Sequence, residues 1–236
     1  MSATVHLFES KDALADAAAA EFASILGDAL DREGRASVML SGGSSPKPTY
    51  ERLAQAPLAW NGVGVSLVDE RWVPSGAQGS NADFIRDCFA GTPAERAQFV
   101  PLFNGHDTAA EGVEAAEQAL ALLKQPFDLC VLGMGSDGHT ASWFPHADGL
   151  DAALDPDNHA TLCAVHAKQS EVTGELTERI TLTYGAVAAA KHVVLMLPSA
   201  DKMAAFREAM TRDTRDAPVA SLNRLGDRLH VYGVGD

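Results

Sequence analysis

The sequence predicts an α/β fold, a single Rossmann-like domain in which a largely parallel sheet is flanked by helices on both faces. Short apolar runs alternate along the chain with longer segments of helical periodicity. Strands that alternate with helices require right-handed crossover connections, which lay helices over both faces of a parallel sheet. The 236 residues are 46% hydrophobic and contain no internal repeat or low-complexity linker, so we expect one domain over residues 1–236.

Strands are predicted where β-branched and apolar residues form short runs. They cover residues 5–8, 36–41, 62–68, 127–133, 161–166, 179–184, 192–198 and 229–234. The clearest helices cover residues 11–32, 47–55, 81–90, 108–124 and 201–210. Ser45 and Pro46 precede the second helix as a usual cap and first-turn pair, and residues 75–80 and 146–158 are expected to be short polar loops. Ligands of such sheets bind beyond the carboxyl ends of the strands.

The charge balance is strongly acidic, with 18 basic and 32 acidic residues and a formal net charge of -14. Such a chain repels nucleic acid and anionic membranes unless basic residues gather locally, so we expect neither as a partner. No apolar run approaches the roughly 20 residues that span a bilayer. Cys88, Cys130 and Cys163 form no CxxC pair, which argues against a disulfide framework or a zinc ribbon. We expect a cytoplasmic protein, and no feature of the sequence specifies an oligomeric state.

The first candidate site is SGGSSPKP, residues 41–48, which follows a predicted strand and opens a helix. Gly42 and Gly43 allow the backbone to turn closely. Ser44, Ser45 and the first helical amides present donors at the positive end of a helix dipole. This arrangement predicts a phosphate cradle, although a plain strand-to-helix turn explains the motif equally well. It matches neither GxxxxGK[ST] nor GxGxxG, so nucleotide binding is not indicated.

The second candidate site is VDERWVP, residues 68–74, at the end of a predicted strand. Asp69 and Glu70 point to opposite faces while the chain is extended, so we expect them to have different roles, with one facing a cleft. Arg71 offers a planar, permanently charged fork for a phosphate or a carboxylate. Taken alone, the motif is also typical of a solvated strand end that carries one ion pair.

The third candidate site is GMGSDGHTASWFPH, residues 133–146, directly after the apolar run FDLCVL. Its three glycines permit close backbone approach, Asp137 can orient a neighbouring imidazole, and the imidazole of His139 can act as a general acid or base. His139 is therefore the candidate base, and the alternative is a histidine that caps the turn. Trp143 and Phe144 are expected to lie in the core or in a cleft wall, and His146 is expected to be a loop residue. The sequence has no HxH, HExxH or Cys/His cluster, so no metal ligand is predicted.

The order and spacing of five segments carry a family resemblance: LSGGSSPKPTYERLA, VDERWVP, SNADF, FDLCVLGMGSDGHTASWFP and ERITLTYGAV. Together they resemble 6-phosphogluconolactonases, within the broader family that includes glucosamine-6-phosphate deaminases. The resemblance extends from about Leu40 to the LMLPSADK segment. It implies hydrolysis of 6-phospho-D-glucono-1,5-lactone to 6-phosphogluconate in the oxidative pentose phosphate pathway. The implied partner is a small phosphorylated sugar lactone, and no metal or organic cofactor is implied.

The resemblance also implies residue roles. The glycine-rich turn corresponds to the phosphate loop of the family, and the histidine of GxDGHT corresponds to its base. We therefore predict that phosphate and substrate are bound by Ser41, Gly42, Gly43, Ser44, Arg71, Arg179 and Lys202. The predicted catalytic residues are His139, Asp137 and Asp69. Between Pro74 and Ser80 the chain has SGAQG, where the family often has acidic residues.

Lactone hydrolysis needs an activated water and a proton for the departing ring oxygen. Neutral His139 would take a proton from water, and the resulting imidazolium would return one to the leaving alkoxide. Asp137 would set the tautomer of His139 or favour its protonated form. Phosphate clamping would convert remote binding energy into orientation of the carbonyl.

Two alternative functions remain open. A glucosamine-6-phosphate deaminase would share the three motifs, but its pattern has a glutamate five residues after the histidine, where this chain has Phe144. A non-catalytic sugar-phosphate-binding module would use the same fold, but usually with an additional DNA-binding or partner domain. A serine hydrolase is disfavoured because GxSxG is absent.

Overall fold

The computed structural model describes residues 3–235. Its main sheet has the strand order β1-β10-β9-β6-β2-β3-β5, and each neighbouring pair is parallel. The strands are β1 (Thr4–Phe8), β2 (Ala36–Leu40), β3 (Val63–Leu67), β5 (Gln98–Phe99), β6 (Leu129–Gly133), β9 (His192–Leu197) and β10 (Leu229–Val234). From β2 the chain proceeds to β3 and β5, then returns to the other side of β2 as β6. The winding direction therefore reverses between β2 and β6.

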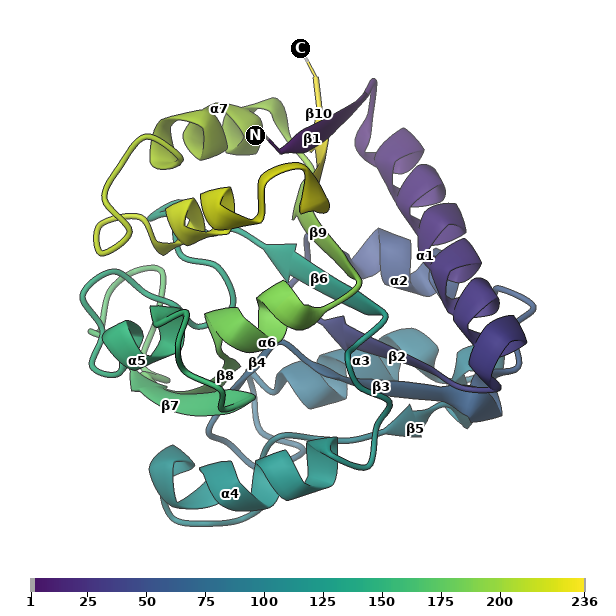
Figure 1. Ribbon diagram of the computed structural model, residues 1–236, viewed down its shortest axis with the longest axis horizontal. Helices are drawn as coiled ribbons and strands as arrows, with labels where there is room; N and C mark the ends of the chain where they lie inside the picture. Colours follow the sequence, from purple (N-terminus) through teal and green to yellow (C-terminus); the bar gives the residue numbers. More distant parts are fainter. Residues whose placement is uncertain (1–2, 236) are drawn as a thin grey trace.

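Helices cover both faces of this sheet, with α1 on one side of β9 and β10 and α7 on the other (Figure 1). The central strands β2 and β3 are buried along their whole length, as expected for a parallel sheet covered on two faces. The α-helices are α1 (Lys11–Glu33), α2 (Lys47–Leu53), α3 (Asn81–Phe89), α4 (Ala109–Leu120), α5 (Leu150–Leu154), α6 (Tyr184–Ala189) and α7 (Ala200–Ala209). The 3-10 helices are η1 (Trp60–Gly62), η2 (Pro93–Arg96) and η3 (Pro218–Arg228). None of the described helices combines the length and hydropathy that a bilayer-spanning helix needs.

Local signals explain where the longer helices begin and end. The Ser10 hydroxyl accepts from the amide of Ala13 at the start of α1, and Gly34 closes this helix with a φ of 69°. A capping box formed by Thr108 and Glu111 starts α4. These signals are readable from the sequence, which is why the predicted starts of the five clearest helices lie within one residue of those observed.

Three strands form a separate antiparallel sheet with the order β4-β8-β7, which comprises β4 (Asp69–Arg71), β8 (Glu178–Leu182) and β7 (Leu162–His166). The sequence correctly predicts strands at 161–166 and 179–184, but their assignment to a largely parallel sheet is wrong. The segment between these strands forms no helix. Without a crossover helix the two strands pair antiparallel as neighbours, and β4 adds to their edge.

Several short elements were not predicted, namely β4, β5, α5, α6 and the 3-10 helices. Most of them are two to six residues long, too short to show a repeating hydrophobic pattern. The exception is η3, whose 11 residues are interrupted by a kink at Gly226. The segment 146–158, which was expected to be a loop, contains α5. The helix expected over 108–124 is shorter than predicted and ends at Leu120. The expected Ser-Pro cap of α2 is also wrong, because Pro46 occupies the cap position and makes no side-chain hydrogen bond.

Candidate active site

A cleft of about 290 Å³ lies beyond the carboxyl ends of β2 and β6, where the winding direction reverses. The loops that follow β2 and β6 form two of its walls, and β4 with its neighbour β8 contributes side chains from the second sheet. All predicted site residues except Asp137 line this cleft: Ser41, Gly42, Gly43, Ser44, Asp69, Arg71, His139, Arg179 and Lys202. The fold therefore brings together residues that are far apart in the sequence.

The turn after β2 is held by groups on its outer side. Tyr50, from α2, donates its hydroxyl to the Ser41 carbonyl oxygen at 3.1 Å. Gly43 has a φ of 94°, a conformation that glycine adopts without strain. A Cβ on Gly42 would overlap the side-chain amide of Asn81. Two glycines are thus required here, one by its backbone conformation and the other by a close approach.

Asp69 and Glu70 do point in different directions. Asp69 is 7% exposed and lines the cleft, and its Oδ2 accepts from the Ser142 hydroxyl at 2.6 Å. Glu70 is fully buried and accepts from the backbone N–H groups of Asn81 and Ala82 at 2.8 Å. Burial raises the pKa of Glu70, although these N–H donors oppose the shift. Glu70 is therefore a cap for α3, and Asp69 is the carboxylate of the cleft.

Three basic side chains reach the cleft from separate elements. Arg71 and Arg179 are direct partners across the β4–β8 pair. Arg179 is 3% exposed and donates to the Leu176 carbonyl oxygen at 2.7 Å, and burial lowers its pKa to about 10. Lys202 donates to the Met134 carbonyl oxygen at 3.0 Å, and burial, together with Lys11, lowers its pKa.

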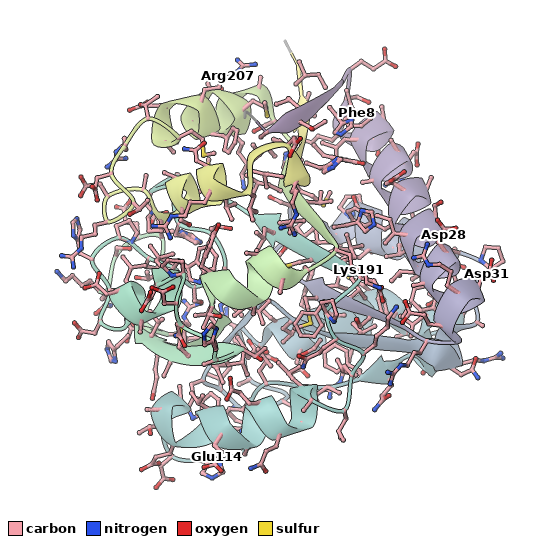
Figure 2. The ribbon with its side chains drawn as sticks, in the orientation of Figure 1. Phe8, Asp28, Asp31, Glu114, Lys191 and Arg207 are labelled. Carbon is pink, nitrogen blue, oxygen red and sulfur yellow. The ribbon has the colours of Figure 1, made fainter. Side chains whose placement is uncertain are left out.

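These cations make no close ion pair with a carboxylate of the described residues. In the part of the chain that the structure describes, none of Arg71, Arg179 and Lys202 forms a salt bridge. Much of the acidic charge instead lies on outer helix surfaces, as Asp28 and Glu114 illustrate (Figure 2). A protein with a net charge of -14 thus has a locally cationic cleft, which suits an anionic ligand.

His139 is oriented by Asp137. Its Nδ1 lies 2.6 Å from Asp137 Oδ1, which also accepts the backbone N–H of His139 at 3.1 Å. Burial alone would raise the pKa of Asp137, but the hydrogen bond and charge of His139 outweigh burial and lower it. A carboxylate only accepts hydrogen bonds, so Nδ1 carries the proton. Nε2 of the neutral ring is then an acceptor, and no group within residues 3–235 donates to it. The His139 side chain is 20% exposed and lines the cleft.

The turn that carries His139 requires glycine at two positions. A Cβ on Gly135 would overlap the imidazole of His139. Gly138 has a φ of 84°, and its carbonyl oxygen accepts from the backbone of Val219 at 3.0 Å. The segment before η3 packs behind it through Ala217. Asp137 and His139 are consequently held by glycine-dependent packing on both sides of the turn.

The two aromatic residues that follow His139 lie in different environments. Trp143 is fully buried and donates its indole N–H to the Leu182 carbonyl oxygen at 2.8 Å, so it belongs to the core. Phe144 lines the cleft, with its ring centroid 4.3 Å from that of His139. The Arg179 guanidinium lies over the same ring at 5.3 Å. His146 is a loop residue that pairs with Asp216 at 2.9 Å.

Two residues of the site were not assigned roles by the sequence. Asn81 lines the cleft and contacts Gly42, and Ser142 donates to Asp69. Both stand inside quoted motifs, SNADF and HTASW, yet an asparagine or serine has no distinctive spacing of its own. Among residues 3–235, no group of three or more His, Cys, Asp or Glu side chains is arranged to hold a metal ion.

Comparison with known proteins agrees with this geometry. The family described as "Glucosamine-6-phosphate isomerases/6-phosphogluconolactonase" matches residues 9–231. The chain belongs to this family. A 6-phosphogluconolactonase from Rhizobium meliloti (strain 1021) is 38% identical over 234 residues, which cover 98% of this chain and 99% of the relative.

Solved structures show the same fold. A 6-phosphogluconolactonase from Shewanella baltica OS155 superimposes with a TM-score of 0.90 at 32% identity, covering 99% of this chain and 98% of the other. A monomeric glucosamine-6-phosphate deaminase superimposes with a TM-score of 0.79 at 17% identity, covering 98% and 97% of the two chains. The architecture is therefore common to lactonases and deaminases, and the residues of the cleft have to distinguish them.

Proposed function

We propose that this chain hydrolyses 6-phospho-D-glucono-1,5-lactone to 6-phosphogluconate, with His139 as the base that activates water. The observation that carries the proposal is the Asp137–His139 pair, joined at 2.6 Å, in a cleft lined by basic side chains that form no salt bridge within residues 3–235. The pair supplies the acid/base group, and the basic side chains supply the affinity for a phosphorylated substrate. Relatives that are more than a third identical over nearly the whole chain support the same activity.

The proposed reaction requires two proton transfers. Neutral His139 takes a proton from water at Nε2 while the water oxygen attacks the lactone carbonyl carbon. The tetrahedral intermediate then collapses, the bond between this carbon and the ring oxygen breaks, and the imidazolium returns the proton to that oxygen. Asp137 stabilises the imidazolium because it retains its negative charge throughout. Arg71, Arg179 and Lys202 hold the phosphate and so orient the carbonyl.

Phe144 argues against the deaminase alternative. The deaminase pattern requires a glutamate at this position, and the phenyl ring that packs on His139 cannot transfer a proton. A binding module without activity would have no need of an imidazole aligned by a carboxylate. The cleft therefore favours the lactonase over both alternatives.

Product formation by the purified protein tests the proposal. We expect 6-phosphogluconate to form from the lactone well above the spontaneous rate, and no ammonia to be released from glucosamine 6-phosphate. Lactone hydrolysis at the background rate, or ammonia release, would contradict it. Because the lactone also hydrolyses without enzyme, the background has to be subtracted at each pH.

A further inference from the structure

Asn81 is a residue of the cleft wall that the proposed chemistry does not use. It is the first residue of α3 and is 3% exposed. Its backbone N–H donates to Glu70 Oε1 at 2.8 Å, which completes the helix cap without the side chain. The contacts of the side-chain amide are therefore additional to those needed to start the helix.

The side-chain amide bridges two alternate residues of β4. Its Nδ2 donates to the Asp69 carbonyl oxygen at 2.9 Å, and its Oδ1 accepts from Arg71 Nη1. A carbonyl oxygen only accepts and a guanidinium only donates, so these two partners fix the orientation of the amide. A buried amide that is satisfied at both ends holds Arg71 in one place relative to its strand.

Arg71 retains donors for a ligand. Its Nη1 is shared between Asn81 and the Gly79 carbonyl oxygen, the latter at 2.9 Å. Within residues 3–235, Nε and Nη2 of Arg71 donate to no protein acceptor. Arg71 lines the cleft, so an anion bound there can accept from the two free nitrogens as a bidentate pair.

The same amide supports the turn after β2. A Cβ on Gly42 would overlap the Oδ1, Cγ and Nδ2 atoms of Asn81, so this turn rests directly on the amide. Asn81 thus contacts both the glycine turn of the main sheet and the guanidinium of the second sheet. A movement of its side chain would change the distance between these two groups.

We propose that Asn81 is a positioning residue for the phosphate of the substrate. Its side chain orients the Arg71 guanidinium and fixes the distance between Arg71 and the Gly42 turn. The proposal rests on the proposed function, because it assigns the phosphate to these two groups. Asn81 acts through Arg71 and Gly42, and the proton transfers of His139 do not depend on it.

Kinetics with two substrates test this role. Asn81→Ala is assayed with 6-phosphogluconolactone and with unphosphorylated glucono-1,5-lactone. We expect KM for the phosphorylated lactone to rise about tenfold, the scale of one charge-assisted hydrogen bond, with kcat within about twofold of the parent. kcat/KM for the unphosphorylated lactone should change less than about twofold. An equal loss with both substrates, or a loss confined to kcat, would overturn the proposal.

A double-mutant cycle tests the contact with the glycine turn. Gly42→Ala has to displace the Asn81 amide, so it should raise KM for the phosphorylated lactone as Asn81→Ala does. In the double variant the new methyl group occupies the vacated space, and we expect a combined effect smaller than the product of the single effects. A multiplicative combination would show that the two residues act independently.

Two further variants control for loss of folding. Asn158 is an amide that is also bonded at both ends, to the Ala152 carbonyl oxygen at 2.8 Å and the Ala160 backbone N–H at 3.0 Å, outside the cleft. Asn158→Ala should leave both substrates within about twofold of the parent. If Asn81→Ala does not fold, Asn81→Asp keeps the size but sets a carboxylate against Arg71 that competes with phosphate. An unchanged KM in Asn81→Asp would contradict the positioning role.

Binding of 6-phosphogluconate separates this proposal from the proposed function. Calorimetry on the parent and on Asn81→Ala should show a rise of about tenfold in Kd. If the parent binds 6-phosphogluconate but does not hydrolyse the lactone, the proposed activity is wrong. The ratio of the Kd values of Asn81→Ala and the parent still tests the positioning role of Asn81. An unchanged Kd overturns the role of Asn81 even if the parent is an active lactonase.

Discussion

Lysines lie at both ends of the parallel strands, and among the described residues only those at the amino end are paired with carboxylates. At the amino end, Lys124 Nζ lies 2.7 Å from Asp128 Oδ1 and 2.9 Å from Glu33 Oε1. Lys191, labelled in Figure 2, joins the same two carboxylates at 3.0 and 3.1 Å. At the carboxyl end, the partners of Lys202 within residues 3–235 are neutral, namely the Met134 carbonyl oxygen and the Ser45 hydroxyl.

The difference distinguishes a structural charge from a binding charge. A buried cation that is paired on several sides has its charge satisfied within the protein, and removing a partner is destabilising because the remaining buried charge is less well compensated. A cation with neutral partners keeps most of its attraction for an external anion. We therefore expect substitutions at the amino end to affect folding, and substitutions at the carboxyl end to affect substrate binding.

The largest effect is expected for Asp128→Ala at the amino end. The change removes one of the two carboxylates paired with Lys124 and leaves Glu33 as the other. It also removes the acceptor of the Ser37 backbone N–H, which is bonded at 2.9 Å. We expect the free energy of unfolding to fall by about 3–5 kcal/mol, measured by urea denaturation. The folded fraction should retain the parental KM. A loss below about 1 kcal/mol would show that this cluster is not structural.

His139→Asn should have the next largest effect, a fall in kcat of about 100-fold or more. Asparagine keeps similar size and some hydrogen bonding but cannot accept and return a proton. The variant should fold and bind 6-phosphogluconate nearly as well as the parent. In the parent, kcat should rise with pH because only a neutral imidazole can accept a proton from water, and this limb should vanish in the variant. A folded variant that retains most of its kcat would remove His139 from the mechanism.

Lys202→Met should raise KM for the phosphorylated lactone about tenfold and leave kcat nearly unchanged. Lys191→Met, a change of the same kind at the amino end, is the matched control and should leave KM unaltered. A pure kcat effect in Lys202→Met would contradict a binding role.

The lowered pKa of Lys202 predicts a pH dependence of product binding. A lysine with a lowered pKa loses its charge at a lower pH than free lysine does, so affinity for 6-phosphogluconate should begin to fall earlier on the alkaline side. Lys11→Met removes one cause of the shift and should move this limb to higher pH. Calorimetry across the alkaline range measures both, and an identical limb in Lys202→Met would assign it to another group.

Metal removal should have the smallest effect. A histidine-activated water needs no metal ion to hydrolyse an ester, so dialysis against EDTA should leave kcat and KM unchanged. Loss of activity that Zn²⁺ or Mg²⁺ restores would overturn the proposed mechanism.

Much of the site was predictable because its residues stand next to strand ends. Gly42 and His139 belong to loops that begin where the apolar runs of β2 and β6 end, and in a parallel sheet such loops meet at one edge. The separate antiparallel sheet was not predictable in the same way. Strands β7 and β8 are short runs with apolar and β-branched residues, as main-sheet strands are, and the absence of a helix between them is what indicates antiparallel pairing.

The sequence by itself determined the order of the elements, the positions of the glycines and the opposite directions of Asp69 and Glu70. These properties depend on neighbours a few residues away, through strand alternation and backbone conformation. Tertiary structure decided which carboxylate faces the cleft, because α3 begins behind Glu70 and takes it as a cap. It also decided that Arg71 lies opposite Arg179 and that Asn81 supports Gly42. Such contacts join residues from different elements, and only the packing of those elements against one another creates them.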